Sequence, residues 1–164
     1  MTEQVQRIID LLGLIPHPEG GFFRETFRSD HGLTLAPGGK KRSASTAIYF
    51  LLPAGTFSAF HVVRGADECW HHYAGNAVEI HMIAPNGNHR IEVLGSDVLE
   101  GERPQVVVPA DMLQAAIPRG TSFSLCGCTV TPGFELADFE MPTRGELLGR
   151  FPQHESVIRR LTRA

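Results

Sequence analysis

Hydrophobic and polar residues alternate over short segments through most of the chain, as they do where successive side chains point to opposite faces of a β-strand. Residues that favour turns, chiefly Gly, Pro, Asn and Asp, separate these segments. The segments predicted as strands are residues 22–29, 46–53, 55–63, 67–75, 77–85, 89–95, 105–108, 113–117 and 122–130. Because no long helical pattern lies between them, the chain is predicted to be an all-β antiparallel sandwich or barrel.

Both ends of the chain show helical spacing instead. Residues 3–12 repeat apolar side chains on one helical face, and Thr2 is placed to cap the first turn. Residues 143–162 begin with Thr143 and Glu146 at capping-box spacing. Short helices are therefore expected at the two ends of the β-structure, whose core should span about residues 20–141.

Composition limits the class of protein. With 164 residues and 42% apolar side chains, residues 1–164 are expected to form one domain. The net charge is −3 and no block of Lys or Arg is present, which disfavours a nucleic-acid partner. No apolar run approaches the roughly 20 residues of a membrane span, so no membrane partner is expected. Three cysteines without framework spacing are typical of a reducing compartment, and a cytoplasmic location is predicted.

Residues 55–75 carry the candidate chemistry. If the strands at 55–63 and 67–75 pair as antiparallel neighbours, His61 and Glu68 come within contact distance on one inward face. The same alternation places Trp70 and His72 on the Glu68 face. A polar pair inside an apolar hollow is typical of a small-molecule pocket, although His61 could also be a hydrogen-bonded core histidine.

The spacing from Gly55 through His61 and Glu68 to Gly75 resembles the first signature of the cupin superfamily. One branch, a set of small single-domain cupins of unknown function, is similar over about residues 11–141 through HPEGGFFRETF, TAIYFLL, SAFH, DECWHHYAG, LGSD and CTVTPGFELADFE. The resemblance implies a double-stranded β-helix of two facing antiparallel sheets, a pocket at its mouth, and a homodimer formed through the N-terminal strands.

The resemblance also implies what a metal site would need. Metal-bearing cupins supply His-x-His and Glu from the first signature and one more His from the second. Here Val63 stands at the second His position and Gln114 at the last one. No metal or other cofactor is therefore predicted; a divalent metal, if bound, would use His61, Glu68, Gln114 and His72.

Without a metal, His61 and Glu68 can act as an acid/base pair for proton transfer beside a carbonyl group. Similarity to sugar-nucleotide 3,5-epimerases among the cupins points the same way, and implies a small polar ligand that is carbohydrate-like or nucleotide-sugar-like. The predicted reaction, if the protein is an enzyme, is epimerisation or isomerisation. The alternatives are a non-catalytic cupin that binds or senses a small ligand and a metal-dependent oxygenase or isomerase.

Further side chains are expected to line the pocket. Arg24 and Glu25 lie on opposite faces of a regular strand, so at most one of them faces the ligand unless a bulge intervenes. Trp70 is either a pocket wall or core. The set of predicted ligand-binding residues is Phe23, Arg24, Glu25, Phe50, Phe60, Trp70, His72 and Gln114.

Two loops are predicted, one at residues 17–21 and one at residues 31–45. Residues 17–21, His-Pro-Glu-Gly-Gly, are explained by the requirements of a turn, and no role is assigned to them. Residues 31–45 are polar and Gly-rich, and a surface loop is predicted that could cover the pocket.

Overall fold

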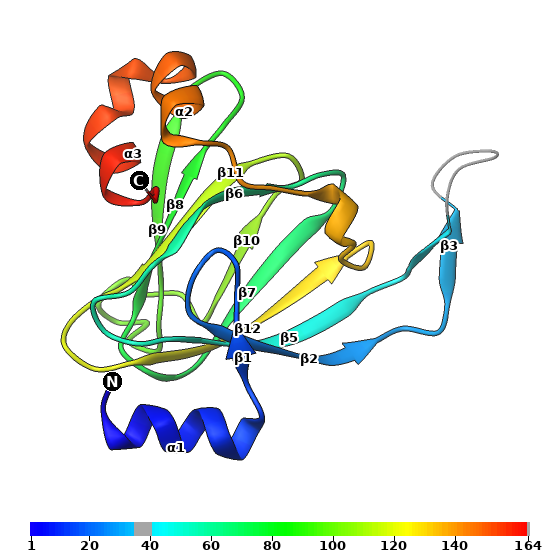
Figure 1. The fold of residues 1–164 in the computed structure, drawn as a ribbon, viewed down its shortest axis with the longest axis vertical. Helices are drawn as coiled ribbons and strands as arrows, with labels where there is room; N and C mark the ends of the chain where they lie inside the picture. Colours follow the sequence, from blue (N-terminus) through cyan, green and yellow to red (C-terminus); the bar gives the residue numbers. More distant parts are fainter. Residues whose placement is uncertain (35–40, 164) are drawn as a thin grey trace.

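Two antiparallel sheets face each other in the computed structural model, which describes residues 1–34 and 41–163 (Figure 1). The larger sheet contains, in spatial order, β1 (Ile15–Pro16), β2 (Phe22–Arg28), β5 (Thr46–Leu52), β12 (Ser124–Thr131), β7 (Asp67–Gly75) and β10 (Gln105–Val108). The smaller sheet contains β13 (Phe139–Glu140), β6 (Ser58–Val63), β11 (Leu113–Pro118), β8 (Val78–Ile83) and β9 (His89–Leu94). The predicted double-stranded β-helix is confirmed.

The main core lies between the two sheets, where the inward residues of alternating strands meet. β5 contributes Phe50 and Leu52, β7 contributes Trp70, and β8 contributes Ile80 and Met82, all of them almost fully buried. Alternation along each strand sends these side chains to the inner face and their neighbours, such as Leu51 of β5, to the outer face. The hydrophobic pattern of the sequence therefore determines which face of each sheet is enclosed.

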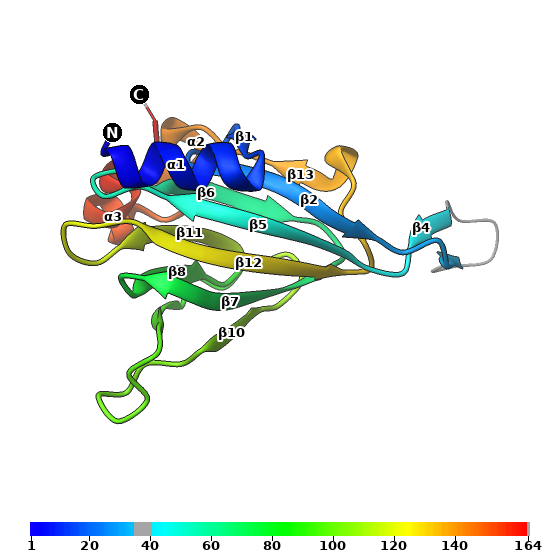
Figure 2. The ribbon, with the colours of Figure 1, turned by 90° about the horizontal axis from the view of Figure 1, so that it is seen from below.

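Helix α1 (Glu3–Leu12) covers part of the outer face of the larger sheet (Figure 2). The Thr2 hydroxyl accepts a hydrogen bond from the Val5 backbone N–H, which caps the helix as predicted. Val5 and Ile9 are buried against Leu51 of β5 and Phe123. The amphipathic pattern of the N-terminus is thus explained by this packing.

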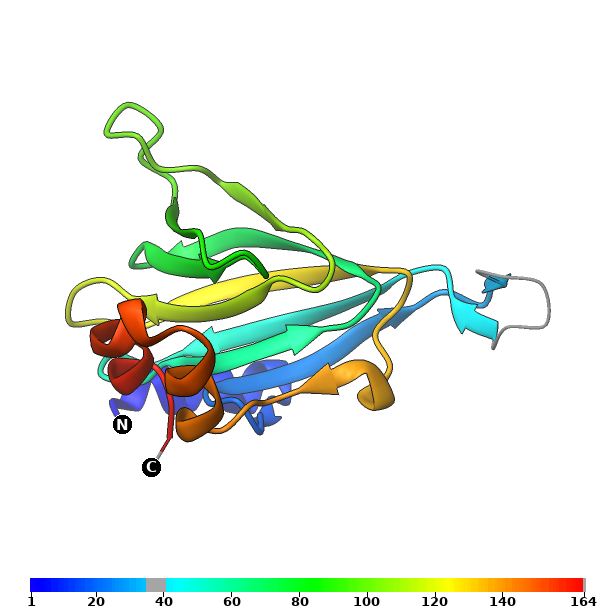
Figure 3. The ribbon, with the colours of Figure 1, turned by 90° about the horizontal axis from the view of Figure 1, so that it is seen from above.

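The C-terminal helices α2 (Arg144–Arg150) and α3 (Glu155–Arg160), with the short 3₁₀ turn η2 (Pro152–His154) between them, pack on the smaller sheet (Figure 3). Thr143 and Glu146 form the predicted capping box. Leu147 of α2 and Ile158 of α3 are buried beside Phe60 of β6. None of the helices in the described ranges is long and apolar enough to span a membrane.

The predicted pairing of the two central strands is wrong. β6 and β7 follow one another through the turn at residues 64–66, but they belong to different sheets. β6 pairs with β13 and β11, and β7 pairs with β12 and β10, so both edges of each strand are already occupied by partners distant in sequence. The chain therefore crosses from one sheet to the facing sheet where a hairpin was expected, because long-range pairing overrides the local turn signal.

Residues 31–45 contain strands where a surface loop was predicted. β3 (Gly32–Thr34) and β4 (Lys41–Ser43) pair antiparallel and form a ribbon that extends away from the barrel (Figures 1 and 3). Residues 35–40, which belong to the predicted cover of the pocket, lie outside the described residues. The described residues of this segment are not part of the pocket lining.

Candidate functional site

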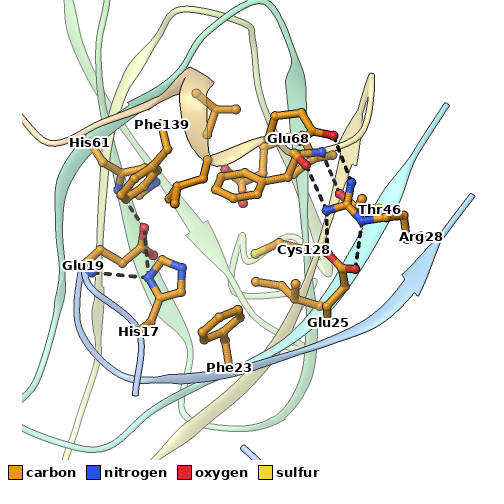
Figure 4. Close-up of a pocket in the computed structure, with 16 residues that line it drawn as sticks. His17, Glu19, Phe23, Glu25, Arg28, Thr46, His61, Glu68, Cys128 and Phe139 are labelled. Atoms are coloured by element: carbon orange, nitrogen blue, oxygen red, sulfur yellow. Dashed lines mark hydrogen bonds and ion pairs between the residues drawn. The ribbon is translucent and has the colours of Figure 1, made fainter. Parts of the chain in front are cut away.

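A pocket of about 390 Å³ opens between the two sheets (Figure 4). Four of the residues predicted to contact a ligand line it, namely His61, Glu68, Phe23 and Glu25. The lining also includes side chains to which no role was assigned: His17, Glu19, Arg28, Thr46, Ile48, Val63, Cys128, Val130, Phe134, Glu135, Leu136 and Phe139. The pocket is therefore mainly aromatic and aliphatic, with two separate polar groups.

The loop at residues 17–21 brings the first polar group into the barrel. The Gly20 N–H donates to the His17 carbonyl oxygen, and the His17 N–H donates to the Gly21 carbonyl oxygen, so the loop closes on itself. The Glu19 carbonyl oxygen accepts a hydrogen bond from the Ala59 N–H of β6. This bond fixes the loop against the smaller sheet and places the Glu19 side chain, which is 5% exposed, inside the pocket.

His61 contacts Glu19 directly. Its Nδ1 lies 2.8 Å from the Ala59 carbonyl oxygen and 3.3 Å from Glu19 Oε2. A carbonyl oxygen can only accept, so the proton of the neutral imidazole is assigned to Nδ1. Nε2 then carries the lone pair, and within the described residues it makes no hydrogen bond. His61 consequently presents an unprotonated nitrogen to the pocket.

His17 has the opposite tautomer. The Glu19 backbone N–H donates to His17 Nδ1 at 3.3 Å, so the proton of the neutral ring lies on Nε2. The ring packs edge-on against Phe23, with ring centroids 4.5 Å apart. Burial, followed by the proximity of His61, lowers the pKa of His17 to about 4. At neutral pH His17 is thus an uncharged hydrogen-bond donor beside an uncharged base.

Burial also determines the charge state of the neighbouring groups. It raises the pKa of Glu19 to about 8, against the smaller opposing effect of the Ser58 hydroxyl, which donates to Glu19 Oε1 at 2.9 Å. Burial lowers the pKa of His61, and the negative charge of Glu68 partly opposes this shift. Near pH 7 the contact between His61 and Glu19 therefore joins two uncharged groups.

Glu68 faces the pocket from the sheet opposite His61. No hydrogen bond or ion pair joins these two side chains in the described part of the chain, although their charges influence each other. Gln114 Nε2 donates to Glu68 Oε2 at 2.5 Å, and Gln114 Oε1 accepts from Trp70 Nε1 at 3.0 Å. The predicted contact between His61 and Glu68 is replaced by two separate contacts, one to Glu19 and one to Gln114.

We expect Gln114→Leu to lower the free energy of unfolding by about 2–4 kcal/mol, because it leaves the Trp70 N–H and the Glu68 carboxyl without partners in a buried place. The exposed Gln105, which bonds to His71, is the matched control, and Gln105→Leu should cost less than about 0.5 kcal/mol. Urea unfolding of both variants measures the difference. Equal losses would mean that the buried chain of hydrogen bonds does not contribute more than a surface bond.

The four side chains that a divalent metal would use, if one were bound, do not converge on one point. Val63 offers no donor atom, and both ends of the Gln114 amide are occupied by Trp70 and Glu68. His72 lies four residues beyond Glu68 on β7, about 13 Å away, with its Nε2 3.2 Å from the Asn76 carbonyl oxygen. Across residues 1–34 and 41–163, no three His, Cys, Asp or Glu side chains are grouped as metal ligands. The arrangement does not fit the ion that metal-bearing cupins hold.

Six of the predicted ligand-binding residues lie outside the pocket lining. Phe50 and Trp70 pack edge to face in the barrel core, with centroids 5.5 Å apart, and Gln114 is enclosed behind Glu68. Phe60 precedes the inward His61 and so points outward, into the cluster beneath the C-terminal helices. The remaining two, Arg24 and His72, are engaged elsewhere: Arg24 Nη1 donates to the Leu12 carbonyl oxygen, and His72 contacts the Asn76 carbonyl oxygen.

A β-bulge in β2 supplies a pocket residue that regular alternation hides. Glu25 pairs with Ile48, and Phe27 pairs with the next residue of β5, so Thr26 is an extra residue without a partner position. The shift puts Arg28 on the same face as Glu25, and both line the pocket. In a regular strand Arg28 would lie on the face opposite Glu25.

Glu19 was missed for a different reason. The Pro and Gly residues of its loop are explained by a turn alone, and for that reason the prediction gives the loop no ligand-binding role. The signal that could have found it is the pair of glycines that follows, because Gly20 and Gly21 both have positive φ, 121° and 70°, and let the loop fold inward against β6.

Comparison with known proteins supports the fold. The family described as the cupin superfamily, DUF985, matches residues 6–142. The Saccharomyces cerevisiae protein YML079W, described as uncharacterised, is 30% identical over 148 residues, covering 82% of this chain and 73% of its own.

Solved structures agree. Protein SO0799 of Shewanella oneidensis has a TM-score of 0.87 and 40% identity, covering 96% of each chain. A hypothetical protein from Leishmania major has a TM-score of 0.89 and 32% identity, covering 97% of this chain and 98% of its own. The descriptions of these three proteins state no activity, so the function of this chain has to be inferred from the chemistry of the site.

Proposed function

Because the chain belongs to the cupin superfamily, in the branch described as DUF985, we propose that its pocket binds a small polar, carbohydrate-like molecule and transfers a proton at a carbon beside a carbonyl group. The reaction class is epimerisation or isomerisation without a metal ion. One observation carries the proposal. A base and a hydrogen-bond donor, both uncharged, line the same pocket: the free Nε2 of His61 and the Nε2–H of His17.

The roles follow from the proton positions. His61 Nε2 takes the proton from carbon, and the His17 Nε2–H donates to the carbonyl oxygen as negative charge develops there. An uncharged imidazole at His17 suits this task, since its proton is held by a weak acid and remains on nitrogen. An oxygen of the uncharged Glu19 carboxyl accepts the hydrogen bond of His61 Nδ1–H and so stabilises the imidazolium. Return of the proton to the neighbouring carbon of the enediolate completes an isomerisation, and return to the opposite face of the original carbon completes an epimerisation.

The expected result for His61→Gln is a loss of about 10²- to 10⁴-fold in proton exchange, the usual contribution of a general base. The assay incubates the protein in D₂O with a panel of small carbonyl compounds and follows deuterium incorporation by NMR. His31→Gln is the matched control, because His31 is exposed and lies outside the pocket lining. Circular dichroism and thermal unfolding show whether each variant keeps its fold.

Unchanged exchange in a folded His61→Gln protein would remove His61 from the chemistry. Binding of a panel member without any exchange by the wild type would instead favour a cupin that carries or senses its ligand. The two results are distinguishable, because binding and exchange are measured on the same samples.

A further inference from the structure

Three charged side chains at the mouth of the pocket bind one another. Arg28 forms a bidentate pair with Glu25, with Nε 3.0 Å from Oε1 and Nη2 2.8 Å from Oε2. Arg28 Nη1 also donates to Glu135 Oε1 at 3.1 Å, and Nη2 donates to the Phe134 carbonyl oxygen at 3.0 Å. Figure 4 shows Arg28 and Glu25 on the side of the pocket opposite His17, Glu19 and His61.

The guanidinium is thus committed to the protein itself. Its rigid fork has five N–H donors, and the Nε–H, one Nη1–H and the Nη2 donors are already used. The bonds to Glu25 and Glu135 raise the pKa of Arg28, so it remains a cation. Arg28 links β2 to the segment that follows β12, and it holds the mouth in shape.

The lining has an excess of acid. Among its described residues it contains one arginine and four glutamates. Even with Glu19 and Glu68 both protonated, two carboxylates at the mouth face a single guanidinium, which leaves a net negative charge. Arg42 is near the same segment, but it lies outside the lining and bonds to the Gly133 carbonyl oxygen and Asp138.

A phosphate group would meet these charges directly. To form a bidentate pair with Arg28 it would have to displace Glu25 or Glu135 and leave that carboxylate beside a new anion, a juxtaposition that opposes binding. The volume of about 390 Å³ lies near the lower end of the range for small-molecule sites. Both charge and size disfavour a nucleotide sugar.

We propose that the ligand of this pocket is an uncharged carbonyl compound of about monosaccharide size, with its polar edge toward His17 and His61 and its apolar face against Phe23 and Phe139. Phosphorylated sugars and nucleotide sugars are excluded by the carboxylates at the mouth. This inference rests on the proposed function only in taking the same pocket as the ligand site. It narrows the ligand class and does not depend on proton transfer.

The test compares wild type with Glu25→Gln/Glu135→Gln. Both proteins are titrated with UDP-glucose and screened against a fragment set with equal numbers of uncharged and anionic carbonyl compounds, using the NMR signals of the His61 and His17 rings. In the wild type we expect pocket signals to move with uncharged fragments and not with UDP-glucose. In the double variant, anionic fragments should gain roughly 10- to 100-fold in affinity, because Arg28 is released from both carboxylates.

Glu3→Gln/Glu100→Gln is the matched control, since it removes the same charge from exposed positions away from the pocket. The single variant Glu135→Gln keeps the bidentate pair and serves if the double variant does not fold. The inference would be overturned if UDP-glucose or anionic fragments moved the pocket signals of the wild type. It would also be overturned if the control variant gained the same affinity for anionic fragments as the double variant. The absence of any gain in a folded double variant or, where the double variant does not fold, in the folded single variant would overturn it as well, because loss of either carboxylate lowers the negative charge at the mouth.

The outcome also separates this inference from the proposed function. Uncharged fragments that bind in the pocket without proton exchange would contradict the proposed reaction and leave the ligand class standing. Anionic fragments that bind in the pocket while proton exchange is intact would contradict the ligand class and leave the proposed reaction standing. If no fragment of either class reaches the pocket, the ligand site itself is wrong.

Discussion

Gly20→Ala is expected to lower the free energy of unfolding by about 3 kcal/mol or more, and to disturb the His17 and Glu19 pair at the same time. Gly20 has φ of 121°, a backbone conformation open essentially to glycine alone. A Cβ at this position would overlap the Phe57 carbonyl oxygen and Arg163 Nη2. The protein has no room to relieve the overlap without moving the loop away from β6.

Gly55→Ala is the control that isolates the effect of packing. Gly55 also has positive φ, 76°, but a Cβ there would meet nothing within 4 Å. Its substitution should cost only the strain of the left-handed conformation, about 1–2 kcal/mol. Urea unfolding of the two variants gives the comparison. Similar losses at both sites would show that the close contact of the loop at residues 17–21 with β6 adds no stability.

The second large effect concerns pH. As the pH rises from 6.5 to 8, the free energy of unfolding of the wild type should fall by about 2 kcal/mol more than that of Glu19→Gln. Burial raises the pKa of Glu19 from 4.5 to about 8, so its protonated form favours the folded state. That stability is complete below pH 4.5 and is lost as the pH rises through about 8. Glutamine carries no charge at any pH and removes this loss.

The window starts at pH 6.5 because the histidines act in the opposite sense below it. Burial lowers the pKa of His17 and His61, so their unfolded forms bind protons first as the pH falls below about 6.5. The exposed Glu100 supplies the control, and Glu100→Gln should follow the wild type across the whole range. If the free energy of unfolding of Glu19→Gln falls with rising pH as steeply as that of the wild type, Glu19 is ionised in the folded protein at neutral pH.

Most of the fold could be predicted from local patterns. Alternation located the longer strands, β2 and β5 to β12, to within a few residues, but it missed the short strands β1, β3, β4 and β13. Caps such as Thr2 and Thr143 marked the helices, because these signals depend on neighbours in sequence. The assignment of β6 and β7 to different sheets could not be predicted in this way. This assignment depends on which strands pair with the two edges of β6 and of β7, and those partner strands are remote in the sequence.

The candidate site could be predicted only in part, for the same physical reason. His61 and Glu68 both line the pocket as alternation suggests, but their hydrogen-bond partners, Glu19 and Gln114, come from other parts of the chain. Alternation also describes a regular strand only, and it fails at Arg28 because a bulge shifts the register. Charge states were inaccessible as well, since burial determines them and burial is a property of the folded chain.

The bulge at Thr26 determines which side chain of β2 stands at the entrance of the pocket. One unpaired residue decides that Arg28 turns toward the ligand while Phe27, 54% exposed, turns toward solvent. Deleting Thr26 would restore the regular pleat and leave both side chains on their present faces, because Phe27 and Arg28 would keep Ala47 and Thr46 as their partners. A strand that kept Thr26 but paired it in the ladder would instead exchange the two side chains, and a phenyl ring would stand at the entrance in place of a guanidinium.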